Sequence, residues 1–448
     1  MSITGNIAEF IETFEYDKIP AKAIDAVKAS FLDYVGVTLA GLTDASPIIV
    51  RRIIEKLGGQ PQATVWGTTL KTSVTHAAMA NGTAAHALDF DDTNMTMMSH
   101  PSIQLLPALF AVGEYHHVSG KEMILAYLTG FEVGAMLGRA MNPEFVGQGW
   151  FPVGPFGVVM QTAACAKLLK LNHDQIENAL GIAANLASGL RCNNGTMAKP
   201  FAPGHSAADA ITAVMLAMDG MSSNRKALED QFGFVENFSR NGVERLEQAV
   251  AALGDPLEIL QSGLSYKLYP CCAGTHTAID CSLDIVRNHP IDPKTIQEIA
   301  VYINPGVQFL LIHPRPTTDM QAKFSLEYCV ARAILDRDIG PEQFALGKVD
   351  DPVVKLLIEK VKPKWEDNRM MEVKIDIRMD NGQSYTSEVL QARGMAGNPL
   401  QWSDLESKFL KCTHTILPEP DLHAKLDQLK NFEQLENVSA FVEFKTEI

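Results

Sequence analysis

Residues 1–260 fall into helix-length segments rich in alanine and large apolar residues, and this feature most limits what the chain can become. From Pro20, which suits the first turn of a helix, apolar residues recur at steps of three and four as far as Leu39. Similar segments follow at 73–88, 103–116, 120–141, 156–169, 173–190 and 206–218. Several are apolar on more than one face, which is typical of helices inside a large bundle. The pattern predicts a mainly α protein with a large all-helical bundle domain.

The pattern changes after Tyr266. Residues 299–303 and 371–379 alternate apolar with polar positions, and an Asp-Asn-Gly turn at 380–382 predicts a β-hairpin. Helical segments at 321–336 and 352–361 lie between these strands, and helical patterns return after residue 402. We therefore expect a smaller α+β lid domain over residues 267–396, and an all-helical domain made of 1–266 plus 397–448.

Composition and charge restrict the partners. Hydrophobic residues make up 46% of the 448 residues and charged residues 20%, which is typical of a globular protein. The formal net charge of −15 argues against nucleic acid or an anionic membrane, because both favour basic surfaces. Seven scattered cysteines fit a reducing compartment, and neither a leader nor a membrane span is evident, so a cytoplasmic location is expected. An anionic ligand would need positive charge gathered locally.

The first dense polar cluster covers residues 86–93 and continues at Ser99-His100-Pro101. Carboxylates and imidazoles this close can ligate Mg²⁺, Mn²⁺ or Zn²⁺. The run from Asp91 to Met95 resembles the metal motif of helical terpene synthases, but it lacks the third acid, so no metal is predicted. As an alternative, Asp91 or Asp92 could cap the end of the preceding helix.

Two further clusters contain lysines. A predicted loop carries Lys199 towards a helix start, where Ser206 and Asp209 could form a capping box. The alternative for Lys199 is a solvated loop lysine. Residues 266–276 contain Lys267 at the predicted domain boundary, where ligand clefts are common. The adjacent cysteines 271 and 272 could form the thiol pair of a racemase, or they could be small buried residues.

These clusters resemble motifs of the MmgE/PrpD family along almost the whole chain. The motifs are residues 81–93, His100-Pro101, Lys199 with Pro203-Gly204, residues 267–276, Phe324-Ser325 with Tyr328, and residues 398–400 leading to Lys408-Phe409. Members include 2-methylcitrate dehydratases, cis-aconitate decarboxylases and iminodisuccinate epimerases. The resemblance implies a large helical domain, a smaller α+β lid, a homodimer, no organic cofactor and a small polycarboxylate substrate bound between the domains.

The resemblance also implies which residues form the site. Lys199, Lys267 and His100 would be catalytic, and the predicted substrate-binding residues are Asp89, Thr93, Cys272, His276 and Tyr328. Cys272 stands where some decarboxylating members have histidine. Phe151 stands where many members have a site histidine in a Gly-aromatic-His-Pro segment, and the stretch between Thr93 and His100 is one residue longer than in the decarboxylases.

The predicted chemistry is removal of a proton next to a carboxylate. Two lysines in a partly dry cleft would lower each other's pKa, so that one acts as base while the other and His100 hold carboxylates. Because Phe151 cannot protonate a leaving group, the sequence favours a cofactor-independent epimerase or racemase, of the kind that acts on iminodisuccinate. A lyase acting on 2-methylcitrate or cis-aconitate is the alternative. Ligand binding without turnover is a third possibility.

Overall fold

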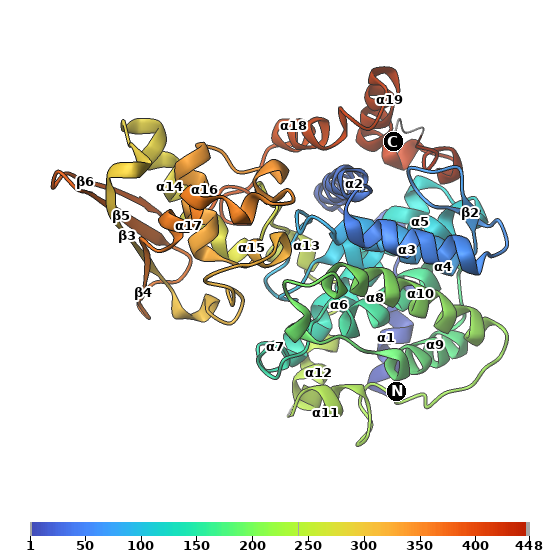
Figure 1. The fold of residues 1–448 in the computed structure, drawn as a ribbon. Coiled ribbons are helices and arrows are strands. Elements are labelled where there is room, and N and C mark those ends of the chain that lie inside the picture. Colours follow the sequence, from blue (N-terminus) through green and yellow to red (C-terminus); the bar gives the residue numbers. More distant parts are fainter. Residues whose placement is uncertain (1, 241, 445–448) are drawn as a thin grey trace.

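The computed structural model describes residues 2–240 and 242–444, and Figure 1 shows two parts side by side. One part is helical and contains both ends of the described chain. The other is built on a small sheet and has helices of its own (Figure 1). The prediction of a mainly α chain is confirmed, and the structure adds a small mixed sheet.

The helical part contains long helices together with a few short ones. Its main elements are α1 (Ile3–Thr13), α2 (Ala21–Gly41), α3 (Ala45–Leu57), α4 (Val74–His86), α5 (Pro101–His116), α6 (Gly120–Met141), α7 (Glu144–Gly147), α8 (Pro155–Leu168), α9 (His173–Leu186), α10 (Ala198–Met218), α11 (Phe234–Phe238), α12 (Gly242–Ala251) and α13 (Glu258–Gln261). After the sheet part the chain returns through α18 (Trp402–Thr413) and α19 (Glu419–Lys430). A short ribbon, β1 (Ala63–Thr64) with β2 (Lys71–Thr72), also belongs here, so this part is not purely helical.

Local sequence explains where these helices begin and how closely they pack. Ser119 and Glu122 form a capping box at the start of α6, which satisfies backbone N–H groups of the first turn. Gly82 in α4 faces Gly204 in α10, and a Cβ atom on Gly82 would lie 2.7 Å from the Cα atom of Gly204. The two glycines therefore allow α4 and α10 to approach closely, and this contact brings the beginning of α10 to the end of α4.

The sheet part contains a four-stranded sheet in the order β4-β3-β5-β6. Its strands are β3 (Ile296–Ile303), β4 (Val361–Trp365), β5 (Val373–Met379) and β6 (Ser384–Val389), and its helices are α14 (His276–Asn288), α15 (Asp319–Ala322), α16 (Leu326–Asp336) and α17 (Pro352–Ile358). The hairpin of β5 and β6 is confirmed. Strand β4 pairs in parallel with β3 and was not predicted, since its polar residues and Pro363 are typical of an edge strand.

Each part has its own hydrophobic core. One core is built from the helices between α1 and α13 other than α3, and it includes Phe409 of α18 and Phe432 after α19. The other lies between the sheet and α14, α16 and α17, with Ile299 and Tyr328 fully buried. The division of the chain into a helical domain of 1–266 plus 397–448 and a lid domain of 267–396 stays a prediction.

Among the described residues, no helix is both long and apolar enough to cross a lipid bilayer.

Candidate active site

The centre of the site is Asp89, which lies just beyond the end of α4. Its backbone is left-handed, with φ 52°, a conformation that aspartate tolerates better than most residues. Its buried carboxylate receives two ammonium groups: Oδ1 lies 2.7 Å from Nζ of Lys199 and 3.0 Å from Nζ of Lys267. Lys267 also donates to the backbone carbonyl of Asp89 at 2.9 Å. The structure therefore brings together three of the predicted site residues.

The two lysines reach Asp89 from distant segments. Lys199 lies in the first turn of α10, which begins at Ala198, and its side chain is buried. The predicted loop is therefore wrong here, and so is the helix start at Ser206, whose hydroxyl donates to the carbonyl of Pro203. Lys267 follows Ser265, whose backbone pairs with that of Thr93 through two hydrogen bonds of 2.8 Å. Thr93 thus helps to align the Lys267 segment with the Asp89 turn.

His86 and His100 share the carboxylate of Asp91. Nδ1 of His86 lies 2.8 Å from Oδ1 of Asp91, and Nε2 of His86 lies 2.7 Å from Nζ of Lys199. Nδ1 of His100 lies 2.6 Å from Oδ2 of Asp91, but the angle between these groups does not fit a hydrogen bond. His86 was not among the predicted site residues, although it stands three residues before Asp89. Its spacing within the polar cluster is the signal that could have identified it.

The charges of these groups are set by burial and by each other. Burial alone would raise the pKa of Asp89, but Lys199 and then Lys267 outweigh it and hold this pKa below its ordinary value. Burial alone would lower the pKa of Lys267, but Asp89 and then Asp91 raise it above its ordinary value. The expectation that the two lysines would lower each other's pKa and leave one of them neutral is therefore wrong for Lys267, because the Asp89 carboxylate lies between them.

The neutral bases of the site are imidazoles. Burial lowers the pKa of His86 to about 4, and burial is also the main reason that the pKa of His100 is lowered. The Lys199 ammonium faces Nε2 of His86, so the proton of the neutral ring belongs on Nδ1, facing Asp91. The His100 side chain is 14% exposed, against 3% for Lys199 and 2% for Lys267. His100 is therefore the most accessible of these groups.

Two phenylalanine rings cover Lys199. The ring of Phe151 lies 5.5 Å from Nζ and stacks on His86 at 6.2 Å between centroids. The ring of Phe324, from the sheet part, lies 5.2 Å from the same Nζ. Phe151 therefore lines the site without offering a proton, and both rings lie within cation–π distance of Nζ of Lys199.

Of the other predicted substrate-binding residues, Cys272 lies next to the site, whereas His276 and Tyr328 bond to other parts of the chain. Burial and the Asp89 carboxylate raise the pKa of Cys272 to about 11, so this cysteine next to the site is a thiol. Cys271 is buried in the core of the sheet part, with Sγ 3.2 Å from Oγ1 of Thr275. His276 contacts the carbonyl of Cys271 at 3.3 Å. Tyr328 donates to the carbonyl of Gln343, so the structure does not bring His276 or Tyr328 to Asp89.

Four residues of this cluster have the ligand types of a metal site. Ligand atoms of His86, Asp89, Asp91 and His100 lie within 4.8 Å of one another. However, the Asp89 carboxylate already faces two ammonium groups, which would repel a divalent cation. The lysines thus supply the positive charge that a metal would bring. The second carboxylate oxygen of Asp89, Oδ2, has no hydrogen-bond partner among the described residues.

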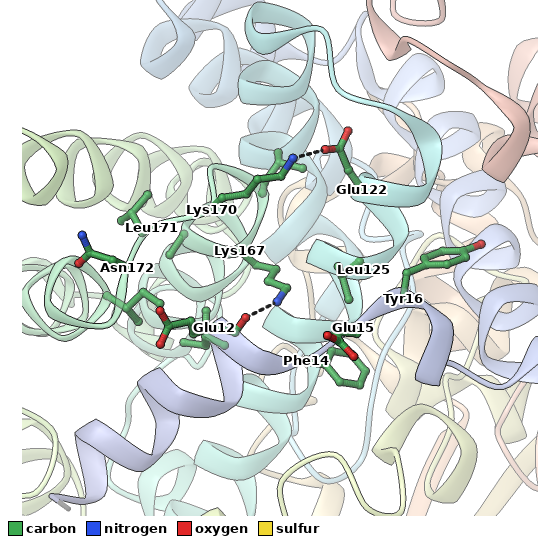
Figure 2. Close-up of a pocket in the computed structure, with 14 residues that line it drawn as sticks. Glu12, Phe14, Glu15, Tyr16, Glu122, Leu125, Lys167, Lys170, Leu171 and Asn172 are labelled. Atoms are coloured by element: carbon green, nitrogen blue, oxygen red, sulfur yellow. Dashed lines mark hydrogen bonds and ion pairs between the residues drawn. The ribbon is translucent and has the colours of Figure 1, made fainter.

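A surface pocket of about 420 Å³ lies elsewhere, between α1, α6, α8 and α9 (Figure 2). Its charged groups are paired with protein partners: Lys170 with Glu122 at 2.9 Å, and Lys167 with the carbonyl of Glu12 at 3.0 Å. None of the predicted site residues lines this pocket. It offers no concentrated positive charge for a polycarboxylate.

Asp92 has a structural role beside the site. It accepts the backbone N–H of Ser102 at 3.0 Å and also contacts the Ser102 hydroxyl, so it caps the start of α5 rather than the end of α4. Burial, and then the neighbouring Asp33, raise its pKa to about 8.

Asp92→Asn is expected to reduce the pH dependence of stability. The folded-state pKa lies above the unfolded value of about 4, so the protonated carboxyl stabilises the native state below pH 4, and this stability is lost as the pH rises towards 8. Because asparagine stays neutral, the Tm of the variant should fall less than that of the wild type between pH 5 and pH 8. Thermal melts across this range test the prediction, and parallel curves would contradict it.

Comparison with known proteins identifies relatives over almost the whole chain. The family model of the MmgE/PrpD N-terminal domain matches residues 5–246, and that of the C-terminal domain matches residues 269–434. The chain is 28% identical to a cis-aconitate decarboxylase of Homo sapiens, covering 98% of this chain and 93% of the relative. It is 25% identical to a cis-aconitate decarboxylase of Aspergillus terreus, covering 98% and 95%.

These relatives overturn the predicted activity. The isomerase prediction, an epimerase of the iminodisuccinate kind, is wrong, because the curated relatives are decarboxylases and favour the lyase alternative. The prediction gave too much weight to Phe151, whose ring covers a lysine that can itself carry a proton. Both family models match in order and together cover most of the sequence, and the chain therefore belongs to the MmgE/PrpD family.

Proposed function

We propose that this protein is a lyase that decarboxylates a small polycarboxylate such as cis-aconitate. The observation that carries the proposal is the pair of buried ammonium groups on Asp89, beside two neutral imidazoles. The names of the curated relatives supply the reaction class. Lys199, Lys267 and His100 are the proposed catalytic residues, and Asp89 holds the two lysines in place.

The reaction places two demands on such a site. When the bond between carbon and a carboxylate breaks, CO₂ leaves and the electron pair stays on the remaining carbon framework, which must take up a proton. The remaining carboxylates must also be held, so that the substrate keeps one orientation. Cationic lysines can meet both demands, because an ammonium group binds a carboxylate and can also donate a proton. His100 is accessible enough to contact the substrate.

Incubation of the purified protein with cis-aconitate tests this function. We expect release of one CO₂ per substrate and, in D₂O, one deuterium in the product, both followed by NMR. A parallel incubation with 2-methylcitrate tests for a dehydratase through ultraviolet absorbance of the new double bond. Consumption of 2-methylcitrate alone, or of neither compound, would contradict the proposed decarboxylase.

Phe151→Leu is expected to lower kcat/KM about tenfold. Leucine keeps an apolar wall, but it removes the ring that faces Lys199 and stacks on His86, and a desolvated cation–π contact contributes ~1–2 kcal/mol. Steady-state kinetics and a thermal melt would separate this effect from a loss of stability. An unchanged kcat/KM in a folded variant would show that the Phe151 ring fills space without contributing to catalysis.

A further inference from the structure

Lys323 interrupts a segment that the sequence predicts as one continuous helix over residues 321–336. In the structure α15 ends at Ala322, α16 begins at Leu326, and Lys323 lies in the break between them. Its side chain is buried, and Nζ donates to the carbonyl of Ala87 at 3.1 Å. No acid of the described chain forms an ion pair with it. Burying an ammonium group without a carboxylate partner costs folding free energy, which suggests that Lys323 has a specific role at this position.

The partner of Lys323 belongs to the turn that presents Asp89. Three carbonyls of this turn accept hydrogen bonds from three buried lysines: Ala87 from Lys323 at 3.1 Å, Asp89 from Lys267 at 2.9 Å, and Phe90 from Lys408 at 2.7 Å. Carbonyls at the C-terminal end of a helix lack helical partners and carry partial negative charge, which favours cations there. The turn is therefore fixed from three separate segments.

Lys323 differs from the other two because it comes from within the sheet part. Its own backbone carbonyl accepts the N–H of Cys272 at 2.9 Å. The next residue, Phe324, places its ring 5.2 Å from Nζ of Lys199. The residue that contacts Ala87 is therefore directly linked to Cys272 and Phe324, two residues of the sheet part that lie at the site.

We propose that Lys323 is a positioning residue that holds the sheet part against the turn at residues 87–91 and so completes the site. Burial is the main reason that the pKa of Lys323 is lowered to about 8. Lys199 adds to this lowering, while Asp44 and Asp89 oppose it and favour the ammonium form that donates to Ala87. When the contact is lost, Phe324 moves away from Lys199 and Cys272 becomes accessible to solvent. Only the kinetic part of the test below rests on the proposed function.

The test compares Lys323→Met with Lys425→Met. Lys425 is also a buried lysine in the helical part, and among the described residues it donates only to backbone carbonyls, those of Ala440 and Phe441. Alkylation by iodoacetamide, followed by tandem mass spectrometry, reports the accessibility of individual cysteines. We expect Cys272 to react at least tenfold faster in Lys323→Met, while Cys165 in the core of the helical part stays protected in both variants.

Two alkylation results would overturn the proposal. One is an unchanged alkylation rate of Cys272 in Lys323→Met, and the other is an equal increase in Lys425→Met, which would indicate general loosening. With an active wild type, kcat/KM should fall about a hundredfold in Lys323→Met and stay within twofold in Lys425→Met. A fall of less than threefold in Lys323→Met would also overturn the role. The alkylation result stands even if cis-aconitate is not the substrate.

Discussion

Lys199→Met is expected to lower kcat about a thousandfold while the chain stays folded. Methionine has about the same length and suits the apolar rings of Phe151 and Phe324, but it removes the ammonium that bonds Asp89, faces His86 and lies over both rings. Groups that transfer a proton or stabilise developing charge commonly contribute factors of ~10²–10⁴. Release of CO₂ from cis-aconitate by the variant, measured at saturating substrate, gives the magnitude.

Lys167→Met is the matched control for this substitution. Lys167 donates to a backbone carbonyl at the surface pocket of Figure 2 and has no contact with the Asp89 cluster. Its kcat should stay within twofold of the wild type. If Lys199→Met retains more than a tenth of the wild-type kcat, then Lys199 does not take part in the chemistry.

Asp89→Asn is expected to destabilise the chain by about 3–5 kcal/mol, because it leaves two buried ammonium groups without their shared carboxylate. The loss should shrink as the pH rises towards 9, since the pKa of Lys267 is raised chiefly by Asp89 and falls when that charge is removed. Urea unfolding at pH 7 and pH 9 measures both effects. Activity should fall as well, since the lysines lose their common anchor.

A polycarboxylate should partly restore the stability of Asp89→Asn. Tricarballylate, a saturated tricarboxylate that has no double bond to react, can supply negative charge to the two lysines. The rise in Tm that it causes should be larger for the variant than for the wild type. Equal rises would indicate that tricarballylate does not bind beside Lys199 and Lys267, and an unchanged unfolding free energy at pH 7 would contradict the ion-pair arrangement.

The helices and the hairpin could be predicted because their signals are local. Gly120–Met141 is predicted to the residue, since a capping box and a long apolar pattern mark it. Lys199 shows the limit of such signals. Pro203 and Gly204 suggest a loop, but packing of α10 on α4 at Gly204 keeps that stretch helical, and a lysine predicted on a loop is buried in the first turn.

Most of the candidate site could be named from the family motifs, but its electrostatics could not. The resemblance predicted Asp89, Lys199, Lys267 and His100, and these residues lie together in the structure. The sequence does not show that Asp89 lies between the lysines, which reverses the expected pKa shift of Lys267. Nor does it show that Lys323 interrupts a helix to reach Ala87, because that contact joins residues 236 positions apart.

The epimerase prediction was wrong because it rested on a single difference from the family, phenylalanine instead of histidine at position 151. Phe151 removes a candidate acid, but the structure places further groups able to exchange protons, Lys199 and His86, next to its ring. The role of a missing side chain therefore depends on what its neighbours can do, and only the assembled site shows those neighbours.

A crystal structure with bound tricarballylate would test most directly where the polycarboxylate binds. We expect its carboxylates to lie within hydrogen-bonding distance of Nζ of Lys199, Nζ of Lys267 and the ring of His100, with the central carbon facing Lys199. Tricarballylate bound only elsewhere, for example in the pocket beside Lys167 and Glu122, would contradict the assignment of the Asp89 cluster as the catalytic site.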